Sequence, residues 1–437
     1  MLQRAMIAAA ALAAALTGSS FAQEQQQVAH IIHAGRLLAD PSNGRVLSEH
    51  SILVGADGKV IAVEAGYVTR AGAAVIDQRN RFVMPGMIDS HVHLRSVERS
   101  PSQLIDAVTL TPADYALRAA QNARTTLNAG FTTVADLGAP NDSIFALRRA
   151  INEGRAVGPR LIAAGNGISI DGGHGDANGW APDVLHALRS ENACSGADAC
   201  RRATRRQIQA GADVIKIAAT GGVLSNTATG LNQQLSDDEL AAIVDAAHSM
   251  GRRVTAHAHG ADGINAALRA GVDSIEHGTY LDRESVRQLR QGNRYLVPTL
   301  IAGWWVLQLA EQGGVLTPAQ EAKARQAGRD MAAMGRFARQ NNVRIAFGTD
   351  SGVSPHGMNA REFALLVEAG FTPLQTIQMA TVNAADHLQL GAVAGRIAPG
   401  FSADVIAVDG DPLTDVAVLE NGVRFVMARG GVARNDQ

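Results

Sequence analysis

One stretch decides the fold, VMPGMIDSHVH at residues 83–93. It begins with a short apolar run, Val83 to Ile88, of the kind that a strand buried on both faces shows. Two histidines follow, His91 and His93, and residues two apart on an extended chain point to the same side. The stretch therefore predicts a buried strand that ends in a pair of imidazoles. Because such a pair alone often occurs by chance, its meaning depends on the strands around it.

Short apolar runs of the same kind recur along the chain, separated by helical patterns. The helix expected at Asp237 to Met250 opens with a capping box, Ser236 and Glu239, and stops at Gly251. Counting Val83 to Ile88, eight strands are predicted, the others being Thr132 to Asp136, Arg160 to Ala164, Val214 to Ala219, Val254 to His257, Ser274 to His277, Leu296 to Leu300 and Val343 to Gly348. Parallel strands need helical crossovers, so this alternation predicts an α/β fold of the (β/α)₈ TIM barrel type.

The two ends of the chain show alternating strands instead, with turn signals between them. They are Ala29 to Leu38, Ser51 to Val54 and Val60 to Ala62 before the barrel, and Ala403 to Val408 and Val423 to Ala428 after it. Each set is too short to fold alone, so we expect both ends to combine into one small β-sandwich domain. The predicted organisation is a β-sandwich from residues 23–82 and 390–437 and a barrel from residues 83–389.

The first 22 residues read as a secretory signal peptide. Arg4 precedes the apolar run Met6 to Leu16, and the small-residue site Ser20-Phe21-Ala22 follows. A membrane anchor is disfavoured because the run is shorter than the roughly 20 residues that span hydrocarbon. The sequence thus predicts cleavage, a periplasmic or secreted protein and no stable membrane span.

Charge and cysteines limit the partners further. Lysine plus arginine number 39 and aspartate plus glutamate 41, a balance that argues against nucleic acid or any partner held by bulk charge. Cys194 and Cys200 lie in a polar stretch, and in an exported protein they predict a local disulfide. A cysteine zinc site would need a second pair, and a catalytic cysteine would need a partner that the neighbouring sequence does not supply.

Lys216 stands out among only three lysines in the chain. Lys59 lies in a turn signal and Lys323 on a polar helix, where lysine is ordinary. Lys216 instead lies inside a predicted strand with apolar neighbours, and a buried ammonium is costly unless it is paired or neutral. Two interpretations remain open: a structural lysine paired with a barrel carboxylate, or a neutral amine that reacts with carbon dioxide to give an anionic carbamate ligand.

Three other predicted strands also end in residues that can bind metal or transfer a proton. They are His257 on the fifth strand, His277 on the sixth and Asp350 after the eighth. In a barrel of this type the carboxyl ends of the strands form the face that carries the active site. Together with His91, His93 and Lys216, these residues predict a metal centre on that face.

These motifs resemble the metal-dependent amidohydrolase superfamily, in its binuclear branch with a carboxylated lysine. The resemblance covers nearly the whole mature chain and is carried by PGMIDSHVH at 85–93, TGGV at 220–223, HAHG at 257–260 and GTDSG at 348–352. Within the superfamily, the chain is similar to Xaa-Pro and Xaa-Arg dipeptidases and to bacterial amidohydrolases that degrade ochratoxin A. That resemblance also implies a homo-oligomer, up to an octamer.

The resemblance implies two divalent metal ions and a role for each strand-end residue. One ion would be held by His91, His93 and Asp350, the second by His257 and His277, with carboxylated Lys216 bridging both. Zn²⁺ fits these ligands best, although manganese or cobalt could replace it. A hydroxide between the ions would attack the scissile carbonyl, and Asp350 would move the proton to the leaving amine.

Substrate contacts are expected from the loops after the strands. His259 would donate a hydrogen bond to the substrate or its developing oxyanion, or else orient the loop. His174 and His356 would contact substrate or pack within their loops. Val223, Leu224 and Ser225 could line a side-chain pocket. Arg95 is the one arginine near the metal motif, Trp304-Trp305 could wall the pocket or pack between subunits, and the remaining histidines are expected to be structural or on the surface.

The function predicted is that of an exported hydrolase acting on small-molecule amides or dipeptides. It would split the amide bond before a C-terminal amino acid, in dipeptides, in N-acyl amino acids or in ochratoxin A, which would give ochratoxin alpha and phenylalanine. A lactonase or another cyclic-amide hydrolase on the same scaffold is the alternative. Mononuclear deaminases lack the bridging lysine, and a non-catalytic binding protein would be expected to lack several of the ligands.

Overall fold

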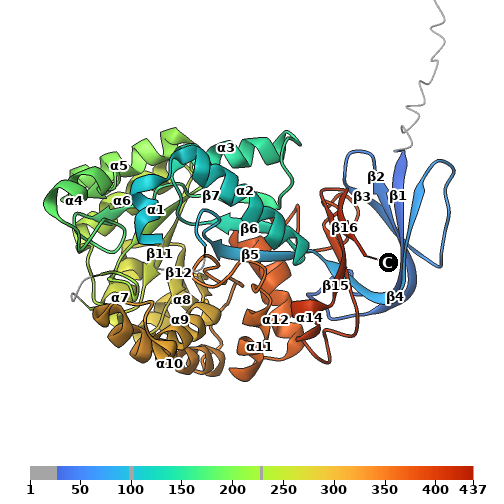
Figure 1. The fold of residues 1–437 in the computed structure, drawn as a ribbon. Coiled ribbons are helices and arrows are strands. Elements are labelled where there is room, and N and C mark those ends of the chain that lie inside the picture. Colours follow the sequence, from blue (N-terminus) through green and yellow to red (C-terminus); the bar gives the residue numbers. More distant parts are fainter. Residues whose placement is uncertain (1–26, 98–102, 227–229, 437) are drawn as a thin grey trace, which may run out of the picture.

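The computed structural model describes residues 27–97, 103–226 and 230–436. The predicted signal peptide lies outside these ranges. In the described part no helix combines the length and the apolarity that crossing a membrane requires. The chain forms a barrel of strands and helices with a smaller sheet beside it (Figure 1).

The smaller sheet is built from both ends of the chain, as the sequence predicted. Its seven strands run in the order β16-β15-β14-β4-β1-β2-β3, so strands from opposite ends meet where β14 pairs with β4. One apolar cluster joins strands from both ends of the chain, with members such as Ile52 on β2 and Phe425 on β15. The strands are β1 (Val28–Leu37), β2 (Leu47–Gly55), β3 (Val60–Ala65), β4 (Ala74–Pro85), β14 (Val405–Val408), β15 (Val423–Ala428) and β16 (Gly431–Asn435).

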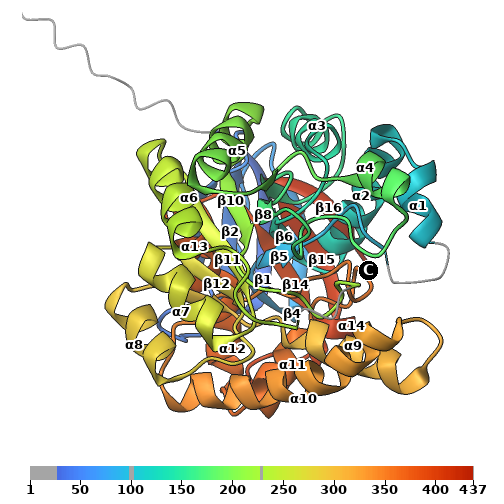
Figure 2. The same cartoon turned by 90° about the vertical axis from the view of Figure 1, so that its left-hand side faces the viewer.

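Parallel strands form the barrel, with helices around them (Figure 2). The regular strands are β5 (Met87–Val92), β6 (Phe131–Asp136), β7 (Arg160–Ala163), β10 (Val214–Ala218), β11 (Arg253–Ala258), β12 (Ser274–His277) and β13 (Tyr295–Val297). Isolated parallel bridges complete the circuit, from Ile168 to Ile217, from Leu296 to Ile345 and from Val92 to Ser351. The predicted barrel with a small β domain is confirmed.

Three predicted strands differ from those observed. The strand predicted at Leu296 to Leu300 is observed at Tyr295–Val297, and a helix begins at Leu300. The run Val83 to Ile88 straddles the junction between the two parts, because β4 ends at Pro85 and β5 begins at Met87. At Gly86 a Cβ atom would lie 2.2 Å from Oγ1 of Thr132, so only glycine fits this junction. The predicted eighth strand, 343–348, pairs only through a bridge at Ile345 and single hydrogen bonds such as Ser90 N to Phe347 O at 2.8 Å.

Helices surround the barrel and carry its loops. The helix that begins at Asp237 forms as predicted, with Ser236 N donating to Glu239 Oε2 at 2.9 Å. Two short strands, β8 (Ser169–Ile170) and β9 (Ala193–Cys194), pair in the loop after β7. The helices are α1 (Gln103–Thr109), α2 (Pro112–Asn128), α3 (Asn141–Asn152), α4 (Pro182–Leu188), α5 (Ala197–Ala210), α6 (Asp237–Ser249), α7 (Ala261–Ala270), α8 (Arg283–Gln291), α9 (Leu300–Gln312), α10 (Pro318–Gln340), α11 (Arg361–Glu368), α12 (Pro373–Gln378), a π-helix (Met379–Asn383), α13 (Ala384–His387) and α14 (Val418–Asn421).

Candidate metal centre and its cavity

Six side chains at the carboxyl ends of the barrel strands line one cavity, and we call them the ligand ring. They come from β5, β10, β11, β12 and the segment after Ile345, and they are His91, His93, Lys216, His257, His277 and Asp350. All but His93 are buried. The structure thus brings together every residue that the sequence predicted as a metal ligand.

Two members of the ring adopt backbone conformations that are unusual for residues with a side chain. His277 has φ of 70° and Asp350 has φ of 58°, both in the left-handed region. Each such residue costs about 1–3 kcal/mol and persists only where surrounding structure enforces it. Gly348 lets the chain approach β5 here, because a Cβ atom would lie 2.3 Å from Val297 and 3.1 Å from His91.

Donor atoms of the ring converge near Asp350. Its Oδ1 lies 3.1 Å from His93 Nε2 and 3.5 Å from His91 Nε2, yet this buried oxygen has no well-aligned hydrogen bond in the described part of the chain. Ligand atoms of His91, His277 and Asp350 all lie within 4.8 Å of one another, as do those of His257, His259 and His277. His277 belongs to both groups, and together they offer nitrogen and oxygen ligands that could hold metal.

Each imidazole of the ring is oriented by a hydrogen bond at its other nitrogen. Such second partners fix which nitrogen is left for a metal. The three Nδ1 contacts are His91 to Glu276 Oε2 at 2.8 Å, His93 to Gly138 O at 3.1 Å and His277 to Thr299 Oγ1 at 2.8 Å. His257 is reversed, with Nε2 at 3.3 Å from Gly221 O, which leaves its Nδ1 for the ring.

Electrostatics keep the ring in the protonation states that metal ligands need. Burial lowers the pKa of His91, His257 and His277 well below the ordinary 6.5, so these imidazoles are neutral. Burial raises the pKa of Asp350, but the neighbouring His91 and His93 outweigh that effect and bring it to about 2. Asp350 is therefore ionised across the physiological range.

Lys216 has no carboxylate partner at ion-pair distance within the described residues. Its Nζ lies 3.2 Å from His91 Nε2, and burial lowers the pKa of the amine below 10.5. A structural lysine would be expected to pair with a barrel carboxylate. The charges of Glu276, Asp350 and Asp136 oppose the lowering of its pKa without pairing with the amine.

A second layer of buried polar residues supports the ring, and sequence reasoning missed it. The Asp89 carboxylate accepts hydrogen bonds from Thr349 Oγ1 at 2.6 Å and Asn359 Nδ2 at 2.8 Å, tying β5 to the segment that carries Asp350. Burial raises the pKa of Asp89 to about 7. Glu276 could have been found from sequence, since a carboxylate inside an apolar strand beside His277 needs a buried partner.

The ring forms the floor of a cavity of about 680 Å³ whose two sides differ in polarity. Aliphatic side chains from the loop after β10, from α9 and α10 and from the segment after Asp350 line one side, and we call it the apolar side: Val223, Leu224, Ala302, Val306, Met331 and Val353. The loops after β5, β6 and β7, with α1 and α2, supply the rest of the lining, in which Leu137, Pro140 and Leu188 lie among polar residues. We call these polar residues the polar side: Arg95, Tyr115, Asn166, Asp176, Arg189 and Glu191.

Two predicted substrate residues, His174 and His259, line this cavity beside the ring. The His174 ring stacks on His257 at 4.1 Å between centroids, and its Nδ1 lies 2.6 Å from Ser225 Oγ. The His259 ring stacks on His277 at 4.9 Å, and its Nδ1 lies 2.7 Å from Thr279 Oγ1. Gly222 makes room for His174, since a Cβ atom there would lie 2.2 Å from that ring.

Other predicted contacts lie behind the cavity surface. Ser225 is buried behind His174 and does not line the cavity. His356 is also absent from the lining, and its Nε2 lies 3.1 Å from Ser96 O, so it ties its loop to the loop after β5. Trp304 and Trp305 do not line it either, although their neighbours on α9 do.

Lys323 is not the ordinary surface lysine that its sequence suggested. Its side chain is half-buried on α10, and Nζ donates to Gly222 O at 2.9 Å and Ser225 O at 2.8 Å. The lysine therefore holds the loop that carries Val223 and Leu224 against the cavity. Only the tertiary structure reveals this contact, because about 100 residues separate the partners.

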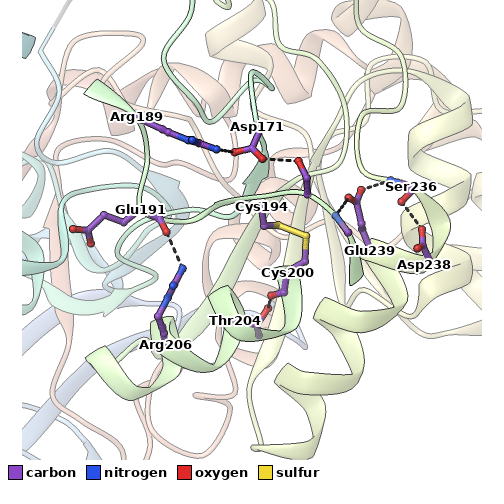
Figure 3. Close-up of a disulfide and its surroundings, with 12 residues drawn as sticks. Asp171, Arg189, Glu191, Cys194, Cys200, Thr204, Arg206, Ser236, Asp238 and Glu239 are labelled. Carbon is purple, nitrogen blue, oxygen red and sulfur yellow. Dashed lines mark hydrogen bonds and ion pairs between the residues drawn. A yellow bond between two sulfur atoms is a disulfide. The ribbon is translucent and has the colours of Figure 1, made fainter. Parts of the chain in front are cut away.

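A long loop after β7 completes the polar side, and we call residues 171–196 the loop wall. The disulfide of Cys194 with Cys200 ties its end to α5 (Figure 3). Asp171 accepts from Ser195 Oγ at 2.5 Å and pairs with Arg189. Helix α4, within the wall, has no buried residue, so covalent and polar ties hold this segment rather than a core of its own.

Comparisons with known proteins agree with this site. The model of the Amidohydrolase family matches residues 82–433. Ochratoxinase from Aspergillus niger is 32% identical over 415 residues, covering 89% of this chain and 83% of that protein. A solved Xaa-Pro dipeptidase with methionine bound in its active site has a TM-score of 0.87 at 36% identity, covering 93% of this chain and 100% of the other. A prolidase complexed with N-methylphosphonate-L-proline has a TM-score of 0.84 at 29% identity, covering the same shares of the two chains. These matches confirm the resemblance that the motifs predicted.

Proposed function

Because the chain belongs to the amidohydrolase family and is a hydrolase of amide or peptide bonds, we propose that it cleaves the bond before a C-terminal amino acid. Dipeptides and N-acyl amino acids are the substrates proposed, ochratoxin A among the latter. The observation that carries the proposal is the complete ligand ring at the floor of a two-sided cavity. Ochratoxinase and the Xaa-Pro dipeptidase support it as relatives named for amide substrates of this kind.

Members of this family generally depend on two metal ions, and the donor atoms of the ring suit them. We propose Zn²⁺, held by His91, His93 and Asp350 on one side and by His257 and His277 on the other. Lys216, converted by carbon dioxide to a carbamate, would serve both ions. When bound, the ions would supply Lewis acidity to the scissile carbonyl and to the attacking water.

The chain's own residues would handle the proton and the carbonyl oxygen. Asp350 is ionised at the cavity floor, so it can accept the proton of the attacking water and deliver it to the leaving amine. His259 lies with Nδ1 against the Thr279 hydroxyl. If Nδ1 accepts a hydrogen bond from that hydroxyl, the proton of the neutral imidazole is on Nε2. Nε2 can then donate a hydrogen bond to the developing oxyanion.

The apolar side of the cavity would take an apolar group of the substrate. Its aliphatic side chains offer contact to an alkyl or aryl group, and burying such a group is favourable by about 25 cal/mol per Å². Lys323 supports this surface by holding the Gly222 and Ser225 carbonyls. His174 would contact the substrate from the boundary of the two sides.

We propose that the protein is exported and works in the periplasm or outside the cell as a homo-oligomer. The signal-peptide pattern of residues 1–22 and a disulfide, which persists in oxidising compartments, support export. Apolar side chains on α1 and α2 that are more than half exposed, Ile105, Val108 and Leu117, support association. Fractionation of cells and light scattering of the purified protein test these two points.

The test of the catalytic proposal combines metal analysis with a substrate panel. We expect two metal ions per active chain and the highest kcat/KM on dipeptides or N-acyl amino acids. Lactones and cyclic amides are measured in the same panel, as the substrates of the alternative function. Fewer than two ions in fully active protein, or a preference for lactones, would overturn it. Asp350→Asn should keep the fold while turnover falls by about 10²- to 10⁴-fold.

A further inference from the structure

Arg95 is a cation of the cavity lining that has no anion at ion-pair distance among the described residues, although the buried Asp136 carboxylate acts on it from farther away. The lining holds one other arginine and one lysine: Arg189, which pairs with Asp171, and Lys216, which belongs to the ligand ring. Arg95 makes no ion pair within the described ranges, and its Nε is buried without a hydrogen-bond partner. A cation left unpaired in a cavity is costly unless the substrate supplies the opposite charge.

The surroundings hold Arg95 in place without satisfying its charge. Its guanidinium carbon lies 5.7 Å from the centroid of the Tyr115 ring. Tyr115 is itself fixed, because its hydroxyl donates to Asp106 O at 3.2 Å. Asp106 pairs with Arg118 at 2.9 Å, so this neighbouring carboxylate is already engaged. A guanidinium stacked on an aromatic ring keeps its edges free, and its planar fork matches a carboxylate.

The position of Arg95 suits one group of the proposed substrate. Arg95 lies two residues after His93, whose Nε2 is 3.1 Å from Asp350. Since Asp350 would protonate the leaving amine, that nitrogen must approach this part of the floor. In a leaving amino acid the α-carboxylate is only two bonds from the amine nitrogen, which brings it to the side of the cavity nearest His93.

The apolar side of the cavity has no cationic side chain in its lining for this carboxylate. It is lined by aliphatic side chains such as Val306 and Met331, and an ionised carboxylate buried there would have no partner. We therefore propose that Arg95 binds the α-carboxylate of the leaving amino acid and so restricts the enzyme to substrates with a free C-terminus. The proposal rests on the amide-hydrolase function proposed above and adds the residue that selects the substrate class.

The consequence is a preference between two substrates that share one scissile bond. N-acetyl-L-leucine and N-acetyl-L-leucinamide differ only in the charge of the terminal group. Losing one partner of a desolvated charge pair typically costs 2–5 kcal/mol, which corresponds to about 30-fold or more in kcat/KM. Because the carboxylate does not react, we expect much of the difference in KM.

The experiment measures both substrates on the metal-loaded enzyme and its variants. Arg95→Gln should lower kcat/KM for the acid by about 30-fold or more and leave the amide unchanged, so the preference disappears. Arg95→Lys keeps the positive charge but loses the planar guanidinium that binds a carboxylate through two hydrogen bonds. This variant should keep part of the preference for the acid over the amide. Arg287→Gln, which changes an exposed arginine on α8 that pairs with Glu284 and does not line the cavity, is the control and should change kcat/KM for either substrate by less than about threefold.

Calorimetric binding of the product gives a second readout that does not depend on turnover. Wild-type enzyme should bind L-leucine more tightly than L-leucinamide, and Arg95→Gln should remove that difference. Equal hydrolysis of acid and amide by the wild type, or an unchanged preference in Arg95→Gln, would overturn the assignment while leaving the hydrolase function intact. If no amide is hydrolysed, the proposed function fails, and the binding arm alone decides the role of Arg95: loss of leucine binding in Arg95→Gln supports it, and unchanged binding refutes it.

Discussion

The ligand ring and the loop wall border the same cavity but are held by different forces. Ring residues end barrel strands, are mostly buried and have their imidazoles fixed by partners such as Glu276 and Thr299. The loop wall has a helix, α4, with no buried residue, and depends on a disulfide and on an ion pair from Asp171 to Arg189. Chemistry that tolerates little displacement is thus placed on strand ends, while the loop that borders the cavity is held by local ties.

The largest effect should follow from removing the one lysine of the ring. Lys216→Ala should lose metal and at least about 10³-fold in kcat, because the ring loses the ligand that would serve both ions. Lys216→Arg should fare no better, since a guanidinium keeps its charge and forms no carbamate. Elemental analysis and kinetics check this, and full activity of Lys216→Ala without added short carboxylic acids would refute the carbamate.

The stability of the fold should fall in acid because of a histidine buried in the barrel. Burial lowers the pKa of His387, at the opposite end of the barrel strands, from 6.5 to about 4. As pH falls through this range the unfolded chain binds a proton that the folded chain does not, so stability is present above pH 6.5 and is lost toward pH 4. The loss is up to about 3 kcal/mol.

His387→Phe keeps a ring against Tyr295 but cannot titrate. Denaturant unfolding at several pH values should therefore give a flatter stability curve for this variant between pH 6.5 and 4. An identical slope in the two proteins would show that His387 does not supply the acid sensitivity.

A smaller change tests whether the partners of the imidazoles matter. Glu276→Gln removes the charge opposite His91 Nδ1 while keeping the shape of the side chain. Metal affinity or activity should fall by about 10- to 100-fold, the usual cost of losing such a partner. The same substitution in the loop wall, Glu191→Gln, should change the metal affinity measured by titration by no more than about twofold. Equal losses of affinity in the two variants would contradict the contrast between ring and wall.

The smallest effect on chemistry is expected from the disulfide. Replacing Cys194 and Cys200 together with serine should lower stability by about 2 kcal/mol and raise KM, with metal content unchanged. Thermal unfolding and kinetics with and without a phosphine reductant check this, because the double variant should not respond to the reductant. Loss of metal on reduction would show that the wall also supports the ring.

Local pattern was enough to predict the barrel, the β domain and the six members of the ring. Buried parallel strands are mostly apolar, so His91 and His277 stood out as polar residues at strand ends and Lys216 as one inside a strand. The predicted strand 83–88 failed at its boundary because an apolar run continues through Gly86 from one sheet into the next. The eighth strand was predicted too long, because the chain at 343–348 makes few of the hydrogen bonds that define a ladder.

The sequence by itself determined which groups could do chemistry, because a strand end fixes the direction of a side chain within a few residues. Only the tertiary structure decided which groups support the metal ligands and the cavity and which would select the substrate. Glu276 meets His91 across 185 positions, Lys323 meets Gly222 across 101, and Arg95 lies beside a ring from α2 that sequence could not place there. Such pairs depend on where loops and helices pack, which is a long-range property that local periodicity does not encode.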